Sequence, residues 1–278
     1  MTDQTLRFAA FKALHARDGA FVIPNPWDGG SARLMAGLGF EALATTSAGY
    51  AFARGKRDSV AVLTREETLA NAAEIVTATD LPVSADLGNG FGHAPEACAE
   101  TVRQACGVGL VGGSIEDATG DPDAPIYDFA QAVERVRAAA EATRDLPFLL
   151  TARSENFLCG RPDLDDTIAR LQAFAEAGAD VLYAPALPDM DAIRRVCAAV
   201  DKPVNVVMGL TGPVWPVAEL AAAGVRRISV GGSFARAALG GLVAAAREVR
   251  ESGTFTYAET AMPGSEIAKL MFGSGRPA

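Results

Sequence analysis

Short apolar runs recur eight times along the chain, and alanine-rich stretches with polar residues at helical spacing separate them. Each run is almost continuously apolar rather than alternating, which is typical of parallel strands buried on both faces. Eight strand and helix units in succession predict an α/β fold of the (β/α)8 TIM-barrel class. The predicted strands are Phe21–Asn25, Ala42–Ser47, Pro82–Leu87, Gly112–Asp117, Pro147–Arg153, Asp180–Pro185, Pro203–Gly209 and Arg226–Gly232.

The stretches between the predicted strands have the periodicity of amphipathic helices, and several end at a glycine. Glycine just after the last helical residue adopts the left-handed conformation that turns the chain back towards the sheet, as expected at Gly178 and Gly224. The predicted helices include Arg65–Thr77, Pro95–Cys106, Phe129–Ala142, Leu164–Ala177 and Val217–Ala223.

The chain has 278 residues, close to the roughly 250 typical of such a barrel, so we expect one domain over residues 1–278. Its apolar stretches are too short to span a membrane, and the first residues mix charges into a short amphipathic helix without an apolar signal region. These features predict a cytoplasmic protein that does not associate with membranes.

The net charge of −9, without any run of Lys or Arg, argues against a nucleic-acid surface. The two histidines cannot build a histidine-rich metal site, and the four cysteines show no CxxC spacing. We therefore expect the chemistry to depend on carboxylates, arginine, backbone donors and a hard metal ion.

Acidic residues follow the predicted strands at the edge where a barrel enzyme has its site. Asp86 ends the third strand, Glu116 and Asp117 end the fourth, and Asp58 lies in the loop after the second. Like charges gathered at one opening are costly unless a cation neutralises them, and Mg²⁺ prefers carboxylate and water ligands. The acids predict a Mg²⁺ site, which Mn²⁺ could also occupy, although each could instead cap a helix or pair with an arginine.

The segment after the second strand suits the recognition of an anion. Small residues at Ser47, Ala48 and Gly49 allow backbone N–H groups to approach a carboxylate or phosphate closely. Arg153, at the end of the fifth strand, can add bidentate recognition of the same kind of group. We expect a small anionic substrate bound beside the metal.

Six motifs in this order resemble the isocitrate lyase and phosphoenolpyruvate mutase superfamily, in particular its carboxyvinyl-carboxyphosphonate phosphorylmutase-like branch. They are PNPWDGGSAR, TTSAG, SADLGNGFG, GGSIEDATG, TARSENF and DVLYAP. The resemblance implies a Mg²⁺-dependent barrel that acts on 2-oxo acids or related dicarboxylates through an enolate. It also implies a homodimer or homotetramer in which the last helix is exchanged between barrels, with residues of about 233–278 in the contacts.

The resemblance also assigns roles to individual residues. Asp86 and Glu116 match the metal site, Asp58 matches an acid that supports it, and Arg153 matches the arginine that contacts the substrate. Asp58 and Arg153 are thus the expected catalytic residues. Ser47, Ala48 and Gly49 match the turn that binds the carboxylate of the substrate, so they and Arg153 are expected to bind the substrate. Apart from the resemblance, Tyr50, Glu155 and Asn205 are expected to contact the distal part of the substrate, although each could instead be structural.

Two departures from the superfamily pattern narrow the expected reaction. The loop Ala118–Asp128 lacks the Cys, Lys and His of the cysteine-dependent lyases, and it also lacks the Lys, Arg and Asn of the mutase. Ser84 stands where some members have a second aspartate before Asp86. What remains is a carbon–carbon lyase or decarboxylase for a compact 2-oxo acid, which needs little from the loop.

Three alternatives stay open at this point. Gly209, Gly212, Gly231 and Gly232 follow the last two strands, where a phosphosugar isomerase or synthase would bind phosphate. A barrel without its catalytic loop could bind a 2-oxo acid without turning it over. An enzyme that cleaves a phosphorus–carbon bond, of the phosphonopyruvate type, is the third alternative.

Overall fold

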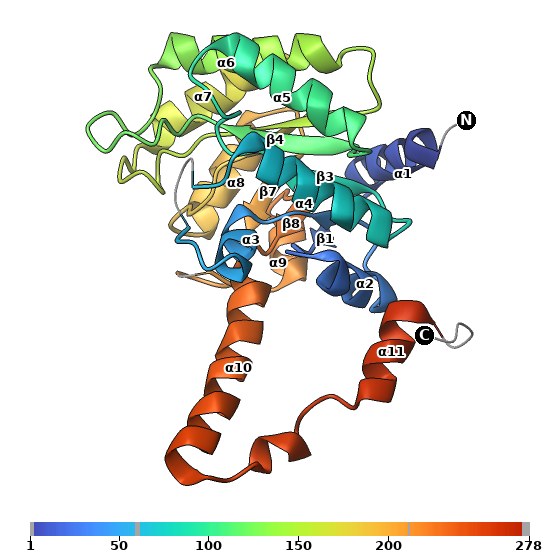
Figure 1. The fold of residues 1–278 in the computed structure, drawn as a ribbon. Coiled ribbons are helices and arrows are strands. Elements are labelled where there is room, and N and C mark those ends of the chain that lie inside the picture. Colours follow the sequence, from blue (N-terminus) through green and yellow to red (C-terminus); the bar gives the residue numbers. More distant parts are fainter. Residues whose placement is uncertain (1–2, 59–61, 211, 274–278) are drawn as a thin grey trace.

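The computed structural model describes residues 3–58, 62–210 and 212–273. In this part of the chain eight parallel strands lie in the order β1-β8-β7-β6-β5-β4-β3-β2, and helices surround them as in a TIM barrel (Figure 1). The predicted fold class is confirmed, and every strand lies within its predicted range. The strands are β1 (Phe21–Ile23), β2 (Leu43–Ala44), β3 (Val83–Asp86), β4 (Gly112–Glu116), β5 (Leu149–Arg153), β6 (Val181–Tyr183), β7 (Val204–Val207) and β8 (Arg227–Ser229).

The seam between β1 and β2 is held by one backbone bond and one side chain. The Ala44 N–H donates to the Pro24 carbonyl at 3.0 Å, just beyond β1. The buried Asn25 side chain donates to the Thr45 carbonyl at 3.0 Å and accepts from the Val230 and Gly231 N–H groups, both at 2.9 Å. One amide therefore ties together the ends of β1, β2 and β8.

Helices follow the strands and cover the outside of the barrel (Figure 1). Their starts carry the capping side chains that the sequence provides: Asp28 and Thr64 each form a capping box with the residue three positions later. The helices after the first are α2 (Gly29–Gly37), α3 (Ser47–Ala53), α4 (Arg65–Ala78), α5 (Pro95–Gly107), α6 (Phe129–Thr143), α7 (Leu164–Glu176), α8 (Met190–Ala199) and α9 (Val217–Ala222).

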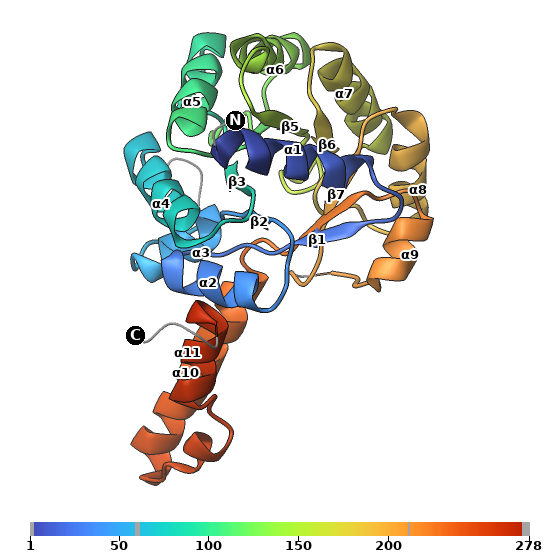
Figure 2. The same ribbon diagram turned by 90° about the vertical axis from the view of Figure 1, so that its right-hand side faces the viewer.

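The first helix, α1 (Asp3–Ala16), lies across the end of the barrel at which the strands begin (Figure 2). Its Phe11 packs against β4 so closely that a Cβ on Gly112 would come within 2.9 Å of the Phe11 ring. The His15 ring lies edge-on to Phe11 and Phe21, and one ring nitrogen, Nδ1, is 2.8 Å from the Phe11 carbonyl. This end is thus sealed by aromatic packing, which leaves the opposite end for a site.

The last segment leaves the barrel as an arm (Figure 1). It consists of α10 (Ser233–Ser252), the short 3-10 helix η1 (Thr256–Glu259) and α11 (Gly264–Phe272). The arm returns to its own barrel, because α11 packs on α2 and the Arg33 guanidinium lies 5.2 Å from the centre of the Phe272 ring. Exchange of this segment between subunits therefore stays a prediction.

None of the helices in the described residues combines the length and the apolar character that a membrane crossing requires.

The buried His15 predicts how stability depends on pH. Burial, reinforced by the charge of Arg227, lowers the pKa of His15 from 6.5 to about 3. Between these values the unfolded chain binds a proton that the folded chain does not, so the free energy of unfolding falls as the pH is lowered from about 6.5 towards 3. The expected slope from this residue is up to about 1.4 kcal/mol per pH unit, measured by urea unfolding.

His15→Gln, which cannot titrate, is the matched comparison. Its free energy of unfolding should depend on pH less steeply than that of the wild type between pH 6 and 4. Identical slopes for the two proteins would show that His15 already carries its proton in the folded state.

Candidate active site

Three neighbouring strands bring charged side chains to the open end of the barrel. Asp86 is the last residue of β3, Glu116 of β4 and Arg153 of β5, and Glu116 pairs directly with Arg153 in the β4–β5 register. The Arg153 Nη1 atom lies 3.3 Å from Asp86 Oδ1 and 3.3 Å from Glu116 Oε2. The structure therefore brings the two predicted metal ligands together around one guanidinium nitrogen.

Glu155 holds the other side of the same guanidinium. Arg153 Nε and Nη2 both lie 2.8 Å from Glu155 Oε1. The Tyr183 ring packs beside the group, with the guanidinium carbon 4.9 Å from the ring centre. Arg153 is thus fixed by three carboxylates and an aromatic face, a geometry that keeps it charged and rigid.

The carboxylates outnumber the cation, and burial makes this costly. Desolvation raises the pKa of Glu116 to about 8, against the lowering effect of Arg153, and desolvation also raises the pKa of Glu155. Asp58 is more exposed, yet partial desolvation and the charge of Asp86 raise its pKa as well. The site favours any added positive charge, because such a charge would stabilise the ionised forms.

Two cavities meet at these residues. The acidic cavity, of about 260 Å³, lies between the loops after β2 and β3 and is lined by Ser47, Asp58, Asp86, Glu116, Arg153 and Glu155, among others. The lateral cavity, of about 290 Å³, shares Ser47, Asp58, Asp86 and Arg153 with it and extends past the ends of β6 and β7. Asp58, Asp86 and Arg153 therefore stand where the two cavities join.

The predicted anion-binding turn forms the start of α3. The Ser47 hydroxyl donates to Asp86 Oδ2 at 2.8 Å, and Ala48 lines the lateral cavity. The Gly49 N–H is donated at 3.2 Å to the hydroxyl of Thr46, the residue that caps the helix. A Cβ on Gly49 would lie 2.6 Å from the Thr46 methyl group, so close packing also requires glycine here. Tyr50 lines neither cavity.

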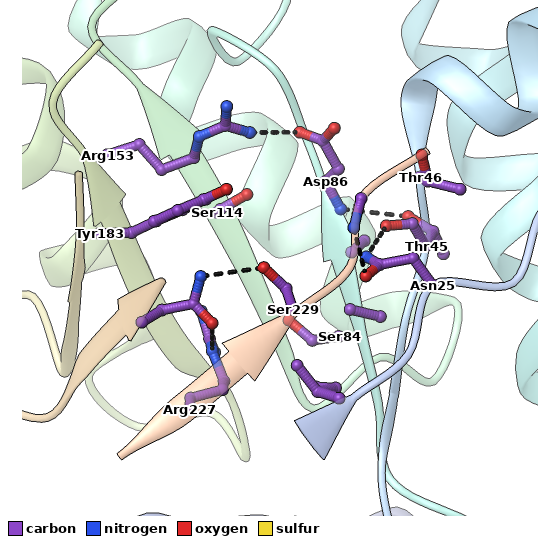
Figure 3. A pocket seen from close by; sticks show the side chains of 15 residues that line it. Asn25, Thr45, Thr46, Ser84, Asp86, Ser114, Arg153, Tyr183, Arg227 and Ser229 are labelled. Carbon is purple, nitrogen blue, oxygen red and sulfur yellow. Dashed lines mark hydrogen bonds and ion pairs between the residues drawn. The ribbon is translucent and has the colours of Figure 1, made fainter. Parts of the chain in front are cut away.

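Asn205 lies deeper in the barrel than the sequence suggested. It lines an inner cavity of about 70 Å³. Figure 3 shows Arg227 and Ser229, which line the same cavity, below Asp86 and Arg153. The Asn205 amide donates to the Ser229 hydroxyl at 3.1 Å and accepts from Arg227 Nε at 2.8 Å. Both ends of the amide are thus engaged, and contact with the substrate stays a prediction for this residue.

Asp117, the neighbour of Glu116, lies on the other face of the strand end and is structural. Its Oδ1 accepts from the Glu155 N–H at 2.7 Å, and its Oδ2 lies 3.1 Å from Arg170 Nη1 on α7. The side chain is almost completely buried. Asp117 therefore anchors the loop that carries Glu155, and it does not face the cavities.

The charge arrangement fits a divalent cation. The described acids of the acidic cavity are Asp58, Asp86, Glu116 and Glu155, and Arg153 is the one basic side chain that lines it. In the described part of the chain, no group of three or more His, Cys, Asp or Glu side chains is placed so that it could hold a metal ion. A cation held by one or two carboxylates with water completing its shell suits this arrangement, and Mg²⁺ commonly binds in that way.

No residue of the loop Ala118–Asp128, which follows β4, lines the acidic or the lateral cavity. Ala118 and Ile126 pair as an isolated antiparallel bridge, and the Cys159 thiol of the next loop donates weakly to the Pro125 carbonyl at 3.7 Å. Desolvation and the neighbouring acids raise the pKa of Cys159 to about 11, so its thiol stays protonated at neutral pH. This cysteine is unsuited to the role that cysteine has in the superfamily's lyases.

Comparison with known proteins identifies the family. Residues 11–250 match the family described as phosphoenolpyruvate phosphomutase. The chain belongs to this family. A candidate lyase/mutase from Burkholderia cenocepacia J2315 has a crystal structure that is 58% identical, with a TM-score of 0.94 and 97% of each chain covered.

More distant relatives have named activities. An oxaloacetate decarboxylase from Chromohalobacter salexigens is 28% identical over 246 residues, which is 87% of this chain and 84% of the relative. The crystal structure of a 2,3-dimethylmalate lyase is 27% identical with a TM-score of 0.85, covering 98% of this chain and 95% of that one. The chain is an enzyme of the isocitrate lyase and phosphoenolpyruvate mutase superfamily, which contains lyases and mutases.

The sequence did not single out Tyr183 and Arg227 as residues of this site. Tyr183 lines both the inner and the lateral cavity, and burial raises its pKa to about 12, so it is a neutral phenol. It is the last residue of β6, a position that could have singled it out. Arg227 has no comparable signal, because only the completed barrel shows that its guanidinium turns inward to Asn205 and Thr151.

The structural role of Asp117, which Asp58 does not share, can be tested by measuring the stability of one variant at each position. Asp117→Asn removes the buried partner of Arg170 and should lower the free energy of unfolding by about 3 kcal/mol. Asp58→Asn removes a carboxyl whose ionised form the site disfavours, and it should change the free energy of unfolding by less than about 0.5 kcal/mol. Urea unfolding of both variants at pH 7.5 measures the difference. Equal losses in the two variants would contradict a structural role specific to Asp117.

Proposed function

We propose that the protein is a Mg²⁺-dependent carbon–carbon lyase or decarboxylase that acts on a small 2-oxo acid or related carboxylate through an enolate. One observation carries this proposal: Asp58, Asp86, Glu116 and Glu155 line the same cavity, and Arg153, which pairs with the last three, is the one basic side chain among the described residues that line it. The named activities of the decarboxylase and the dimethylmalate lyase agree with it.

In this proposal Asp86 and Glu116 hold the metal, directly or through water. A Mg²⁺ ion held by these residues would supply positive charge, and this charge would stabilise the negative charge that develops when the carbon–carbon bond of the substrate breaks. Ser47 positions Asp86 through its 2.8 Å hydrogen bond, so the carboxylate is held in one orientation.

Arg153 binds the carboxylate of the substrate in this proposal. Its Nη1 stands where the acidic and lateral cavities join, and its contacts with Asp86 and Glu116 there are long, at 3.3 Å. Glu155 keeps the opposite edge of the guanidinium in place. Asp58 supports the site from the open side, between the two cavities.

The loop after β4 favours a second candidate, a barrel that binds 2-oxo acids without turning them over. The loop carries no Cys, Lys or His, and Cys159 beside it stays protonated. Turnover of a 2-oxo acid distinguishes the lyase from the barrel that only binds. Cleavage of a phosphorus–carbon bond would instead identify an enzyme of the phosphonopyruvate type.

We also propose that the protein is a homo-oligomer, a dimer or tetramer, which associates through the arm. Leu239, Leu242 and Val243 lie on one face of α10 with 40%, 65% and 44% of their surface exposed. Spacings of three and four residues place these side chains side by side, so a second copy could bury the face they form.

The metal dependence is tested with oxaloacetate, isocitrate, methylisocitrate and phosphonopyruvate in the presence and absence of Mg²⁺. We expect Mg²⁺-dependent release of pyruvate or glyoxylate, and a loss of about 100-fold or more in kcat/KM in Asp86→Asn. Asp80→Asn makes the same change at a fully exposed site and should keep full activity. Activity that persists with a chelator would overturn the proposal, and binding without turnover would support the second candidate.

The oligomer is tested by light scattering after gel filtration. We expect Leu242→Glu to shift the protein to a smaller species, because it places a charge in the apolar face of α10. Leu6→Glu on α1, at a residue with 54% of its surface exposed, is the matched control and should leave the mass unchanged. A wild-type protein that is monomeric at all concentrations would contradict the proposal.

A further inference from the structure

The lateral cavity is divided sharply between a charged end and an apolar end. Its charged lining residues are Asp58, Asp86 and Arg153, all contributed by the loops and strands from β2 to β5. The other end, here called the apolar wing, is formed by the loops after β6 and β7 and by the start of α8. The apolar wing is lined by Pro185, Leu187, Ile193, Met208, Leu210 and Trp215, with smaller residues between them.

The apolar wing is formed partly by residues that are packed into the protein core. Leu187 and Ile193 are buried, with 7% and 1% of their surface exposed, so they belong to the packed core. Ala186 between Pro185 and Leu187 adopts a left-handed backbone conformation with φ of 60°, which is uncommon for a residue with a Cβ. Such a conformation persists only where the surrounding structure holds it. Residues with uncommon backbone conformations cluster at binding sites.

The mouth of the apolar wing exposes two large side chains. Leu158, from the loop after β5, has 54% of its surface exposed, and Leu210, from the loop after β7, has 38%. Both line the lateral cavity. Exposed leucines that face a cavity lose contact with water when an apolar group enters it, and this loss favours binding.

Charge decides what kind of group can enter. Arg153 is the one basic side chain among the described residues that line the acidic and lateral cavities. A substrate carboxylate on Arg153 leaves no second cation for another carboxylate in the apolar wing, and an unpaired buried carboxylate is costly. The distal end of the ligand should therefore be uncharged.

We propose that the substrate is a 2-oxo acid or related carboxylate with an aliphatic substituent of several carbons, which occupies the apolar wing. The inference rests on the proposed function, since Arg153 must hold the carboxylate for the substituent to reach past β6 and β7. It narrows that function, because a plain dicarboxylate such as oxaloacetate leaves the apolar wing unfilled.

The test is calorimetric binding, in the presence of Mg²⁺, of a series of inert 2-oxo acids: pyruvate, 2-oxobutyrate, 2-oxopentanoate and 2-oxohexanoate. Each added methylene that is buried should lower the Kd about fourfold. 2-Oxoglutarate has the chain length of 2-oxopentanoate with a terminal carboxylate, and it should bind more weakly than 2-oxopentanoate.

Variants at the mouth locate the effect. Leu210→Asn should weaken 2-oxohexanoate binding about fivefold and leave the Kd of pyruvate unchanged, because only the longer chain reaches the apolar wing. Leu158→Asn, on the facing loop, should act in the same direction. Val214→Asn is the matched control, since Val214 lies in the same loop as Leu210, with 68% of its surface exposed, and does not line the cavity.

The outcomes separate the two proposals. Equal Kd values along the series, or tighter binding of 2-oxoglutarate than of 2-oxopentanoate, would overturn the apolar substituent while the proposed function stands. A gain with chain length that Leu210→Asn and Leu158→Asn leave intact would also overturn it, because the chain would then lie elsewhere. Failure of every acid in the series to bind would overturn the proposed function together with this inference.

Discussion

The site depends on the Arg153 guanidinium, which neutralises part of a cluster of buried carboxylates. It contacts Asp86, Glu116 and Glu155 within 3.3 Å, and each of these acids comes from a different part of the rim. Without a cation at this point, mutual repulsion and desolvation would drive the acids to protonate or the loops to separate. One cation cannot stabilise the ionised forms of all three acids, and burial raises the pKa values of Glu116 and Glu155.

The pleat of the strands decides which acids share this cluster. Successive residues of a strand point to opposite faces, so Glu116 faces the opening of the barrel while Asp117 turns outward to Arg170. The same alternation directs Asn205, Arg227 and Ser229 inward, where the Asn205 amide bonds to each of the other two side chains. A polar layer of this kind lies directly under the site, and its filled hydrogen bonds leave few ways for the residues above it to shift.

Local sequence patterns were sufficient for the framework and for the acids at its rim. Apolar runs mark the strands, and glycines with positive φ at Gly178 and Gly224 end helices as expected. Asp86 and Glu116 were predicted to lie together because the ends of parallel strands meet at one edge. Pairings between distant residues carry no such local signal. That Gly49 uses its N–H for the Thr46 cap, and that Asn205 is occupied by Arg227, emerges only from the assembled barrel.

The apolar wing is a second feature that carries no local signal in the sequence. In the sequence, Met208, Leu210 and Trp215 look like core residues or an ordinary loop, and only the meeting of the β6 and β7 loops turns them into one wall of a cavity. The apolar wall also affects the charged residues on the other side of the cavity. An apolar group seated there would displace water beside Arg153 and Asp86, and electrostatic interactions strengthen as the surrounding dielectric falls. A ligand that fills both ends of the lateral cavity would thus strengthen the electrostatic interactions of Arg153 and Asp86.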